Sequence, residues 1–301
     1  MYKSKLDIMQ TERMVKFLKT VFEAELSSAL NLSRISAPLF VTKESGLNDN
    51  LNGVERPVSF DVKATGKVVE VVHSLAKWKR YALAKYGFER GSGLYTEMNA
   101  IRRDEDMDNL HSIYVDQWDW EVVIGKEDRN VAFLQSAVRK IYRAIKNTCA
   151  KVREQFPVLS DFLPKDITFV TSQELEDRYP SLTPKQRETE FVKSCGAAFV
   201  MGIGAPLKSG KKHDGRAPDY DDWSLNGDII LYYPPLATAF EVSSMGIRVD
   251  KESLLSQLKA ENCMDRLQLD FHKALLGGEL PLTMGGGIGQ SRLSMFILEK
   301  M

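Results

Sequence analysis

Four of the five residues from 285 to 289 are glycines, and this run restricts what the end of the chain can build. Glycine carries no side chain, so its backbone can approach a bulky group closely. Apolar residues after the run predict a helix, and a glycine-rich strand that leads into a helix N-terminus is suited to bind an anion. Arg292 would add a positive charge in the first turn. A tight turn before a helix explains the same pattern, and no Gly-Lys-Ser/Thr follows to make a Walker loop.

The composition is that of a globular protein without charge bias. Apolar residues make up 43% of the 301 positions and charged residues 27%, which is enough to bury a large core. The 41 basic and 41 acidic residues cancel, which argues against a long nucleic acid as the main partner but leaves ATP open. No apolar run approaches the ~18 residues of a membrane span, and the N-terminus does not resemble a signal peptide.

The cysteines give no sign of a metal or redox motif. Cys149, Cys195 and Cys263 are odd in number and far apart in the chain. This usage fits a reducing compartment, so we expect a cytoplasmic protein.

Periodicity predicts one domain with both helices and strands. Apolar residues at helical spacing predict helices at residues 7–30, 74–86, 131–152, 184–195 and 251–276. Apolar–polar alternation and short apolar runs predict strands at residues 35–41, 58–64, 67–73, 94–101, 110–121, 166–172, 197–203, 228–234 and 238–249. Most strands are joined by hairpins and no linker divides the chain. We therefore expect a single α+β domain over residues 1–301, built on an antiparallel sheet with helices on its flanks.

The strand expected at 110–121 has an unusual face. Gln117, Asp119 and Glu121 would point to one side, with Trp118 and Trp120 on the other. If the polar face is covered, each group needs a partner, and a ligand could be that partner. A solvent-facing strand with outward charges is the alternative.

Several loops carry polar residues that serve either structure or function. Asp49 lies in a polar loop over 48–53 and could simply hold a turn. Residues 208–216 form a basic, glycine-containing loop that we interpret as mobile, either solvated or closing over phosphates. Residues 216–223 combine one arginine, three aspartates and two aromatic residues, a mixture more typical of a functional loop.

Basic and acidic residues near strand ends offer further candidates. Ser74 is the expected N-cap of its helix, and Lys77, Lys79 and Arg80 lie mostly off the apolar face, so a solvated surface is the default. Lys77 is in the first turn and could point into a site at the end of the sheet. Asp228 and Glu241, on neighbouring strands, could share a Mg²⁺ ion, which prefers one or two carboxylates together with phosphates.

Three segments then follow in a fixed order: Arg102 with an acidic cluster and the strand ending at Glu121, residues 240–248, and residues 285–292. This ordered set resembles the catalytic core of class II aminoacyl-tRNA synthetases, most closely the aspartyl and asparaginyl branch. The helix followed by the Pro38 strand looks like the first motif of that class.

A closer resemblance is to the ammonia-dependent asparagine synthetase family, a synthetase core without a tRNA-binding domain. It is carried by residues 73–80, 114–121, 216–223 and 243–248 and extends from residue 8 to residue 298.

The resemblance implies a class II synthetase-like antiparallel sheet flanked by helices, and an enzyme that is an aspartate–ammonia ligase. That family joins L-aspartate and ammonia with ATP and releases L-asparagine, AMP and pyrophosphate. A carboxylate is a poor electrophile, so the β-carboxylate would first attack the α-phosphorus and form a β-aspartyl adenylate. Cations and Mg²⁺ would stabilise the charge that develops on the phosphorus oxygens.

The resemblance also implies roles for individual residues. Arg102 would hold the α-phosphate and Arg292 the distal phosphates, within the ATP-binding set Arg102, Asp228, Glu241, Ser243, Gly287 and Arg292, in which Asp228 and Glu241 are the Mg²⁺ ligands. Aspartate would be bound by Lys77, Gln117, Asp119, Arg216, Tyr220, Asp221, Ser244 and Arg248, the cations on its carboxylates and the acids on its ammonium group. Asp49 would be the general base toward ammonium, so the catalytic set is Asp49, Arg102 and Arg292.

Two alternatives stay open: the catalytic core of an aspartyl- or asparaginyl-tRNA synthetase, and a non-catalytic synthetase paralogue. The neutral charge argues against the first, and the presence of Arg102, Glu241 and Arg292 argues against the second. The chain departs from the family at Ser224, where a longer loop would precede Leu225, and at Met301, where the family continues. These departures question how the substrate is covered. We expect no tRNA or membrane partner, and a homodimer through residues 8–41, because cores of this class are usually dimers.

Overall fold

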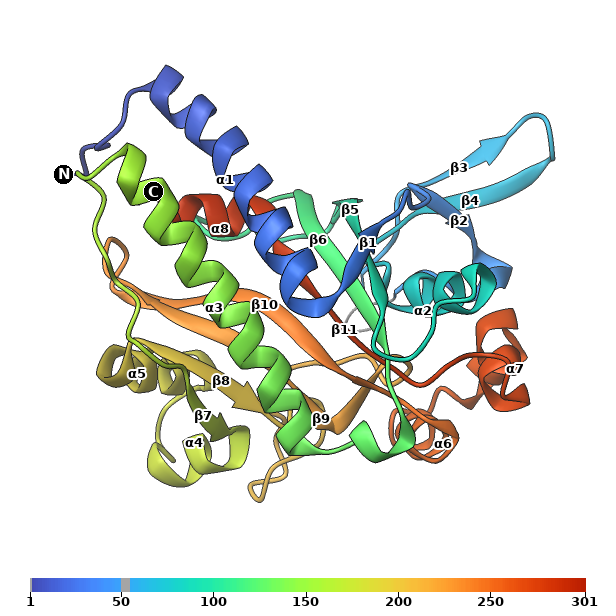
Figure 1. The fold of residues 1–301 in the computed structure, drawn as a ribbon. Coiled ribbons are helices and arrows are strands. Elements are labelled where there is room, and N and C mark those ends of the chain that lie inside the picture. The colour runs from blue at the N-terminus through green and yellow to red at the C-terminus, as the bar shows by residue number, and fades with distance from the viewer. Residues whose placement is uncertain (1, 50–54) are drawn as a thin grey trace.

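An eight-stranded sheet forms the centre of the computed structural model, which describes residues 2–49 and 55–301 (Figure 1). In spatial order the strands are β1 (Leu32–Arg34), β5 (Gly93–Ile101), β6 (Tyr114–Val123), β11 (Thr283–Gly289), β10 (Thr238–Arg248), β9 (Asp221–Tyr233), β8 (Ala197–Met201) and β7 (Thr168–Thr171). All pairs from β5 to β8 are antiparallel, whereas the edge strands β1 and β7 pair in parallel with their neighbours. The predicted α+β fold is confirmed, with two parallel edges added.

Two long helices cover one face of this sheet (Figure 1). They are α1 (Ile8–Leu30) and α3 (Val131–Gln155), joined on the same side by the short α8 (Gln290–Ile297). The predicted stripe on α1 is confirmed, because Leu18, Phe22 and Leu26 are fully buried. The Phe22 ring lies 4.7 Å from that of Trp118, between ring centroids. Burying each such side chain stabilises the fold by about 1.5–3 kcal/mol, so this face is the main core.

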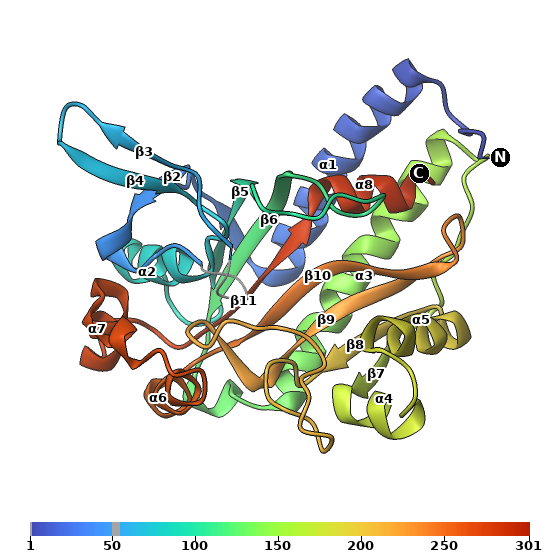
Figure 2. The ribbon, with the colours of Figure 1, turned by 180° about the vertical axis from the view of Figure 1, so that it is seen from behind.

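Shorter helices lie on the other face and leave its middle open (Figure 2). They are α2 (Ala76–Tyr86), α4 (Ser172–Arg178), α5 (Pro184–Cys195), α6 (Lys251–Ala260) and α7 (Asp270–Gly277), with 3₁₀ turns η1 (Lys43–Ser45), η2 (Lys126–Asp128) and η3 (Met264–Gln268) in the connections. Helix α2 packs on β5, β6 and β11, and α5 packs on β8, β9 and β10. The floor between them, on β6, β11 and β10, holds the candidate site.

A small three-stranded sheet projects from the body (Figure 1). It consists of β2 (Phe40–Thr42), β4 (Lys67–Val71) and β3 (Ser59–Val62), all antiparallel. The hairpin expected from residues 58–73 is therefore confirmed. Of the polar loop expected at 48–53, only Asn48 and Asp49 lie within the described residues. None of the helices in the described part of the chain has both the length and the apolar character that membrane crossing requires.

Several predicted elements differ from the observed ones in their bounds, and the start of β9 differs most, at Asp221 rather than at 228. The strand expected at 35–41 is split between β1 and β2, with Pro38 in the irregular stretch between them, and β6 begins at Tyr114 rather than at 110. The N-cap of α2 is Leu75, and the Ser74 hydroxyl instead accepts a hydrogen bond from the Ala76 N–H at 3.1 Å. The helix expected at 251–276 is broken into α6, η3 and α7, with Asn262 in the left-handed region at φ 53°. A residue with positive φ cannot continue a right-handed helix.

Candidate active site

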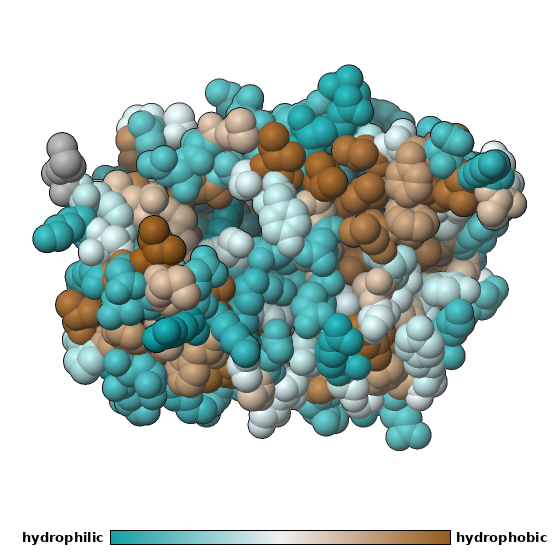
Figure 3. All heavy atoms as spheres, turned by 90° about the horizontal axis from the view of Figure 1, so that it is seen from above, coloured by the Kyte–Doolittle hydropathy of each residue, from teal (hydrophilic) through white to brown (hydrophobic). Residues whose placement is uncertain are grey.

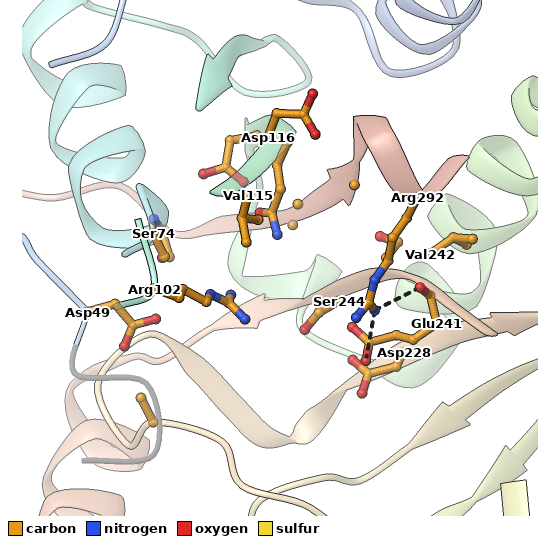
Figure 4. Close-up of a pocket in the computed structure, with 18 of the residues that line it drawn as sticks. Asp49, Ser74, Arg102, Val115, Asp116, Asp228, Glu241, Val242, Ser244 and Arg292 are labelled. Atoms are coloured by element: carbon orange, nitrogen blue, oxygen red, sulfur yellow. Dashed lines mark hydrogen bonds and ion pairs between the residues drawn. The ribbon is translucent and has the colours of Figure 1, made fainter. Parts of the chain in front are cut away.

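A cavity of about 410 Å³ lies on the open face of the sheet (Figure 4). Every predicted site residue except Lys77 lines it, namely Asp49, Arg102, Gln117, Asp119, Arg216, Tyr220, Asp221, Asp228, Glu241, Ser243, Ser244, Arg248, Gly287 and Arg292. Segments from residue 49 to residue 292 thus meet in one place. The roles assigned to these residues remain predictions.

The glycines of β11 make room for the polar side chains of β6. A Cβ atom built on Gly287 would lie 2.2 Å from the Gln117 Oε1 atom, and one on Gly285 would lie 1.8 Å from the Glu121 Oε2 atom. The backbone of β11 therefore passes directly beneath the polar row predicted on the 117–121 strand, and any side chain there would displace it. Gln117 and Asp119 of that row line the cavity and Glu121 is fully buried, while Trp118 and Trp120 are fully buried in the core on the opposite face.

The N-terminus of α8 already binds an anion, and it is a protein carboxylate. The Ser291 N–H donates to Asp116 Oδ1 at 2.9 Å, and the Lys19 ammonium contacts the other Asp116 oxygen at 3.1 Å. The expectation that this helix end is open to a ligand anion therefore needs correction. The glycine run allows close packing against the side chains of β6.

Arg292 lies with the carboxylates of Glu241 and Asp228 at one end of the cavity, which Arg102 also lines (Figure 4). The Arg292 guanidinium donates to the Glu241 carbonyl at 3.0 Å and lies 3.8 Å from the Glu241 carboxylate. Arg102 lies 3.7 Å from Glu105. Within residues 2–49 and 55–301, Arg102 Nε and the buried Ser243 hydroxyl have no hydrogen-bond partner. Buried polar atoms are normally satisfied, so these donors indicate a place for an anionic ligand.

Asp228 and Glu241 have opposite pKa shifts. Burial, reinforced by the neighbouring Glu241, outweighs the Arg216 charge and raises the pKa of Asp228 to about 6. Burial also acts on Glu241, but Arg292, Lys185, Arg216 and Arg102 outweigh it and lower the pKa of that carboxyl. Close acids whose pKa values diverge in this way are typical of a functional site.

The same two carboxylates fit a magnesium ion that is shared with phosphates. No group of three or more potential metal ligands occurs in the described parts of the chain. Mg²⁺ needs only one or two protein carboxylates when phosphate and water supply the other oxygens. The donor set therefore suits a nucleotide-borne ion better than a resident metal.

Arg216 joins the two ends of the cavity. Its guanidinium donates to Asp228 Oδ1 at 2.6 Å and also to the Ser244 hydroxyl. A residue predicted to bind aspartate is thus paired with a predicted metal ligand.

The other end of the cavity is a closed network of buried charges. Arg248 is 3% exposed and grips Glu121 with two nitrogens, Nε to Oε1 at 2.9 Å and Nη2 to Oε2 at 2.7 Å. It also donates to Asp221. Burial lowers the pKa of Arg248, but the Glu121 and Asp221 carboxylates outweigh this and raise it above its ordinary value. Charges arranged in this way can pair with the charged groups of an amino acid.

The cavity is lined by Lys79 of α2 and not by Lys77, the lysine that the sequence predicted for the site. Lys77 is buried outside the cavity lining, with its ammonium 3.1 Å from Asp219, which Arg266 and His272 also contact. Lys79 lines the cavity instead, 3.6 Å from Asp119 and 3.7 Å from Glu121. Burial lowers the pKa of Lys79 despite these acids. Its spacing of four residues from buried Leu75 was the available signal, since that spacing puts both on one helix face.

Asp49 lines the cavity, whereas most of the basic loop at 208–216 lies outside it. Asp49 is 2% exposed, lines the cavity, and its carbonyl lies 3.1 Å from His73 Nδ1. In the loop at 208–216, only the end from Asp214 onward reaches the cavity. Lys208 and Lys212 are paired with Asp177 and Glu261. A basic lid over phosphates is therefore not supported by this arrangement.

Comparisons with known proteins agree on the family and the fold. A family model described as aspartate-ammonia ligase matches residues 9–301. An aspartate–ammonia ligase of Ruminiclostridium cellulolyticum is 63% identical over 99% of this chain and 89% of its own length. One from Fusobacterium nucleatum is 60% identical, over 100% and 91% respectively.

Among solved structures, asparaginyl-tRNA synthetase of Pyrococcus horikoshii complexed with asparaginyl-adenylate has a TM-score of 0.70 at 14% identity, covering 96% of this chain and 66% of that one. Aspartyl-tRNA synthetase of Entamoeba histolytica has a TM-score of 0.64 at 14% identity, covering 96% and 55%. The chain thus spans about two thirds and about half of these two synthetases, and at this identity the likeness concerns the fold.

Proposed function

The chain belongs to the aspartate–ammonia ligase family, and we infer from this that it makes L-asparagine from L-aspartate, ammonia and ATP. The observation that carries the inference is identity of about 60% over the whole chain, joined to a cavity that holds cations and acids at both ends. The first step is attack of the β-carboxylate on the α-phosphorus, giving a β-aspartyl adenylate and pyrophosphate. Ammonia then displaces AMP.

The phosphate end of the cavity would serve the first step. We assign Arg102 to the α-phosphate and Arg292 to the distal phosphates. Both residues line the cavity, and their side chains are 27% and 28% exposed, respectively. Asp228 and Glu241 would hold Mg²⁺, with Ser243 and Gly287 beside the nucleotide. Magnesium would neutralise charge on the phosphate oxygens. Preorganised cations at this position stabilise the transition state more than the ground state.

The closed network at the other end would bind aspartate. Arg248 and Arg216 are suited to its carboxylates, and Asp119 and Asp221 to its ammonium group. Lys79 takes the place first given to Lys77, because only Lys79 lines the cavity. Gln117, Tyr220 and Ser244 complete the orientation of the substrate. Lys77 would act indirectly, by fixing Asp219 beside Tyr220.

Asp49 is the candidate for the general base in the second step. Ammonia is mostly ammonium near neutral pH, so a carboxylate near the acyl carbon must bind it and accept a proton. Asp49 is buried and lines the cavity, which supports this role.

Three further proposals concern partners and setting. Residues 8–41 would form a homodimer interface, supported by large exposed apolar side chains there, Ile8, Met9, Leu39 and Phe40. Figure 3 shows apolar side chains gathered on the face beside the projecting hairpin, where Phe40 and Phe60 contact each other edge to face, with ring centroids 5.2 Å apart.

We take residues 1–301 as one catalytic domain that acts in the cytoplasm. No tRNA is expected to bind, given the formal net charge of zero.

Product analysis tests the proposal. The chain, L-aspartate, ATP, magnesium and ammonium chloride should yield asparagine, AMP and pyrophosphate in equal amounts, measured by chromatography. ADP and phosphate as products would contradict the adenylate route. The rival activity, that of a tRNA synthetase, is favoured only by the structural likeness. It is tested by adding tRNA with labelled amino acid and precipitating the tRNA with acid. Charged tRNA without free asparagine would favour that rival.

A further inference from the structure

Lys185 is paired with a residue that lines the cavity, and it has no role in the reaction described above. It is the second residue of α5, and its ammonium lies 3.3 Å from the Asp214 carboxylate, which lines the cavity. Its side chain is 65% exposed. This exposure makes the ammonium accessible to a ligand.

The lysine is held in place from behind by a fixed carboxylate. Glu188 is 3% exposed; its Oε2 atom lies 3.5 Å from the Lys185 ammonium and its Oε1 atom lies 2.9 Å from buried His213 Nε2. Helix α5 itself is anchored to β10, where the Ala239 N–H donates to the Thr189 hydroxyl at 3.2 Å. The ammonium is thus positioned relative to the strand that carries Glu241.

The helix gains nothing from a lysine at this position. A cation in the first turn of a helix opposes the positive end of the helix dipole. Desolvation lowers the pKa of Lys185, but the carboxylates of Glu188, Glu241, Asp214 and Asp228 outweigh it and raise the pKa. The ammonium thus interacts favourably with four acids, two of which, Glu241 and Asp228, are the candidate magnesium ligands.

The position of α5 complements the two arginines. Arg102 follows β5 and Arg292 follows β11, whereas α5 packs on β9 and β10. Glu241, on β10, lies between the two groups in the order of the sheet. A polyphosphate seated at Glu241 would thus meet the arginines on one side and Lys185 on the other.

We infer that Lys185 is a further binding residue for the β- and γ-phosphates of ATP, which leave as pyrophosphate. The inference rests on the proposed function for the identity of the nucleotide. On binding, the ammonium would exchange its pair with Asp214 for phosphate oxygens and keep its pair with Glu188. AMP has no such phosphates, so Lys185 should distinguish ATP from AMP.

Calorimetric titrations with ATP, pyrophosphate and AMP in one magnesium buffer test this. Lys185→Met should weaken ATP and pyrophosphate binding about tenfold, the loss expected for one charge-assisted contact, and leave AMP binding unchanged. Lys185→Arg should restore most of the loss. Lys193→Met, on the exposed face of the same helix, is the matched control and should change none of the three.

The contradicting results are equally definite. If Lys185→Met leaves ATP and pyrophosphate binding within twofold of wild type, or weakens AMP equally, Lys185 does not contact the distal phosphates. Parallel asparagine assays separate the two levels of the proposal. A chain that binds ATP through Lys185 but makes no asparagine contradicts the proposed function alone, and one that makes asparagine with unchanged binding in Lys185→Met contradicts this inference alone.

Discussion

The two ends of the cavity differ in how far their charges are already paired. At the aspartate end, Arg248, Glu121, Asp221 and Lys79 form a buried network in which each charge has a partner at hydrogen-bond or ion-pair distance. At the phosphate end, Arg102 and Arg292 are more than a quarter exposed and only weakly paired. At one end the charges satisfy one another, and the other end retains unused donors.

The difference indicates two ways in which a protein can recognise a charged ligand. A small zwitterion must be recognised by geometry, and a prepaired network fixes that geometry at the expense of desolvating its own ions. A magnesium-bound triphosphate is large and carries its own counterion, so exposed cations suffice to receive it. Substitutions at the first end should therefore affect folding and activity together, and those at the second end activity alone.

The largest combined effect is expected for Glu121→Gln. It leaves the buried Arg248 and Lys79 without their shared carboxylate, and breaking a buried pair destabilises a fold by about 3–5 kcal/mol. Urea unfolding should show this loss, and aspartate-dependent ATP–pyrophosphate exchange should disappear. Asp161→Asn, which breaks an exposed pair with Arg153, is the control and should change stability by less than about 1 kcal/mol. Equal stability of the two variants would remove the distinction between the ends.

Arg292→Ala should slow adenylation without unfolding the protein. Losing one preorganised cation at a transition-state charge lowers the rate by about 10²–10³-fold. The melting temperature should stay within a few degrees of wild type, because the side chain is 28% exposed. Rapid-quench measurement of pyrophosphate release checks the rate. A variant with normal exchange would move Arg292 off the phosphates.

Asp49→Asn should separate the two chemical steps. Exchange measures only adenylation and should remain largely intact, whereas amide formation should fall by about 10²-fold or more with the loss of the general base. Asn48→Ala is a neighbouring control for disturbance of the loop, since Asn48 accepts the His73 N–H but has no assigned role in proton transfer. Equal loss of both steps in Asp49→Asn would contradict its role as the base.

The smallest effect concerns pH. The pKa of Asp228 is raised to about 6, so the carboxylate is ionised and able to bind magnesium above that pH, and this ability is lost as the pH falls through 6. Magnesium-dependent ATP affinity should weaken about fourfold between pH 7.5 and 5.5 by this titration alone. Asp228→Asn should lack this part of the pH dependence, which calorimetry at both pH values would reveal.

Much of the fold followed from periodicity in the sequence. The long helices, the hairpins and the polar row at Gln117, Asp119 and Glu121 were all predicted, because apolar spacing reports directly which face is buried. Elements whose bounds depend on contacts distant in sequence were missed. The break in the helix at Asn262 and the parallel pairing of β1 and β7 have no strong local signal.

The site was predicted less evenly. Almost all the residues chosen by motif resemblance line the cavity, but Lys77 was chosen and Lys79, on another face of the same helix, was not. The sequence also did not indicate which group approaches the glycine run. Only the three-dimensional packing reveals that side chains from β6 fill the space above it. Lys185 could not have been found from sequence, because Asp214 and Glu241 approach it only in the folded chain.

The central claim is that the β-carboxylate of aspartate is activated as an acyl adenylate before ammonia attacks it. Oxygen labelling tests this claim most directly. Aspartate labelled with ¹⁸O in the β-carboxylate is incubated with the chain, ATP, magnesium and ammonium, and the nucleotide is examined by mass spectrometry. An acyl-adenylate broken by ammonia leaves one labelled oxygen on the phosphate of AMP. Unlabelled AMP, or label in inorganic phosphate together with ADP, would contradict the mechanism.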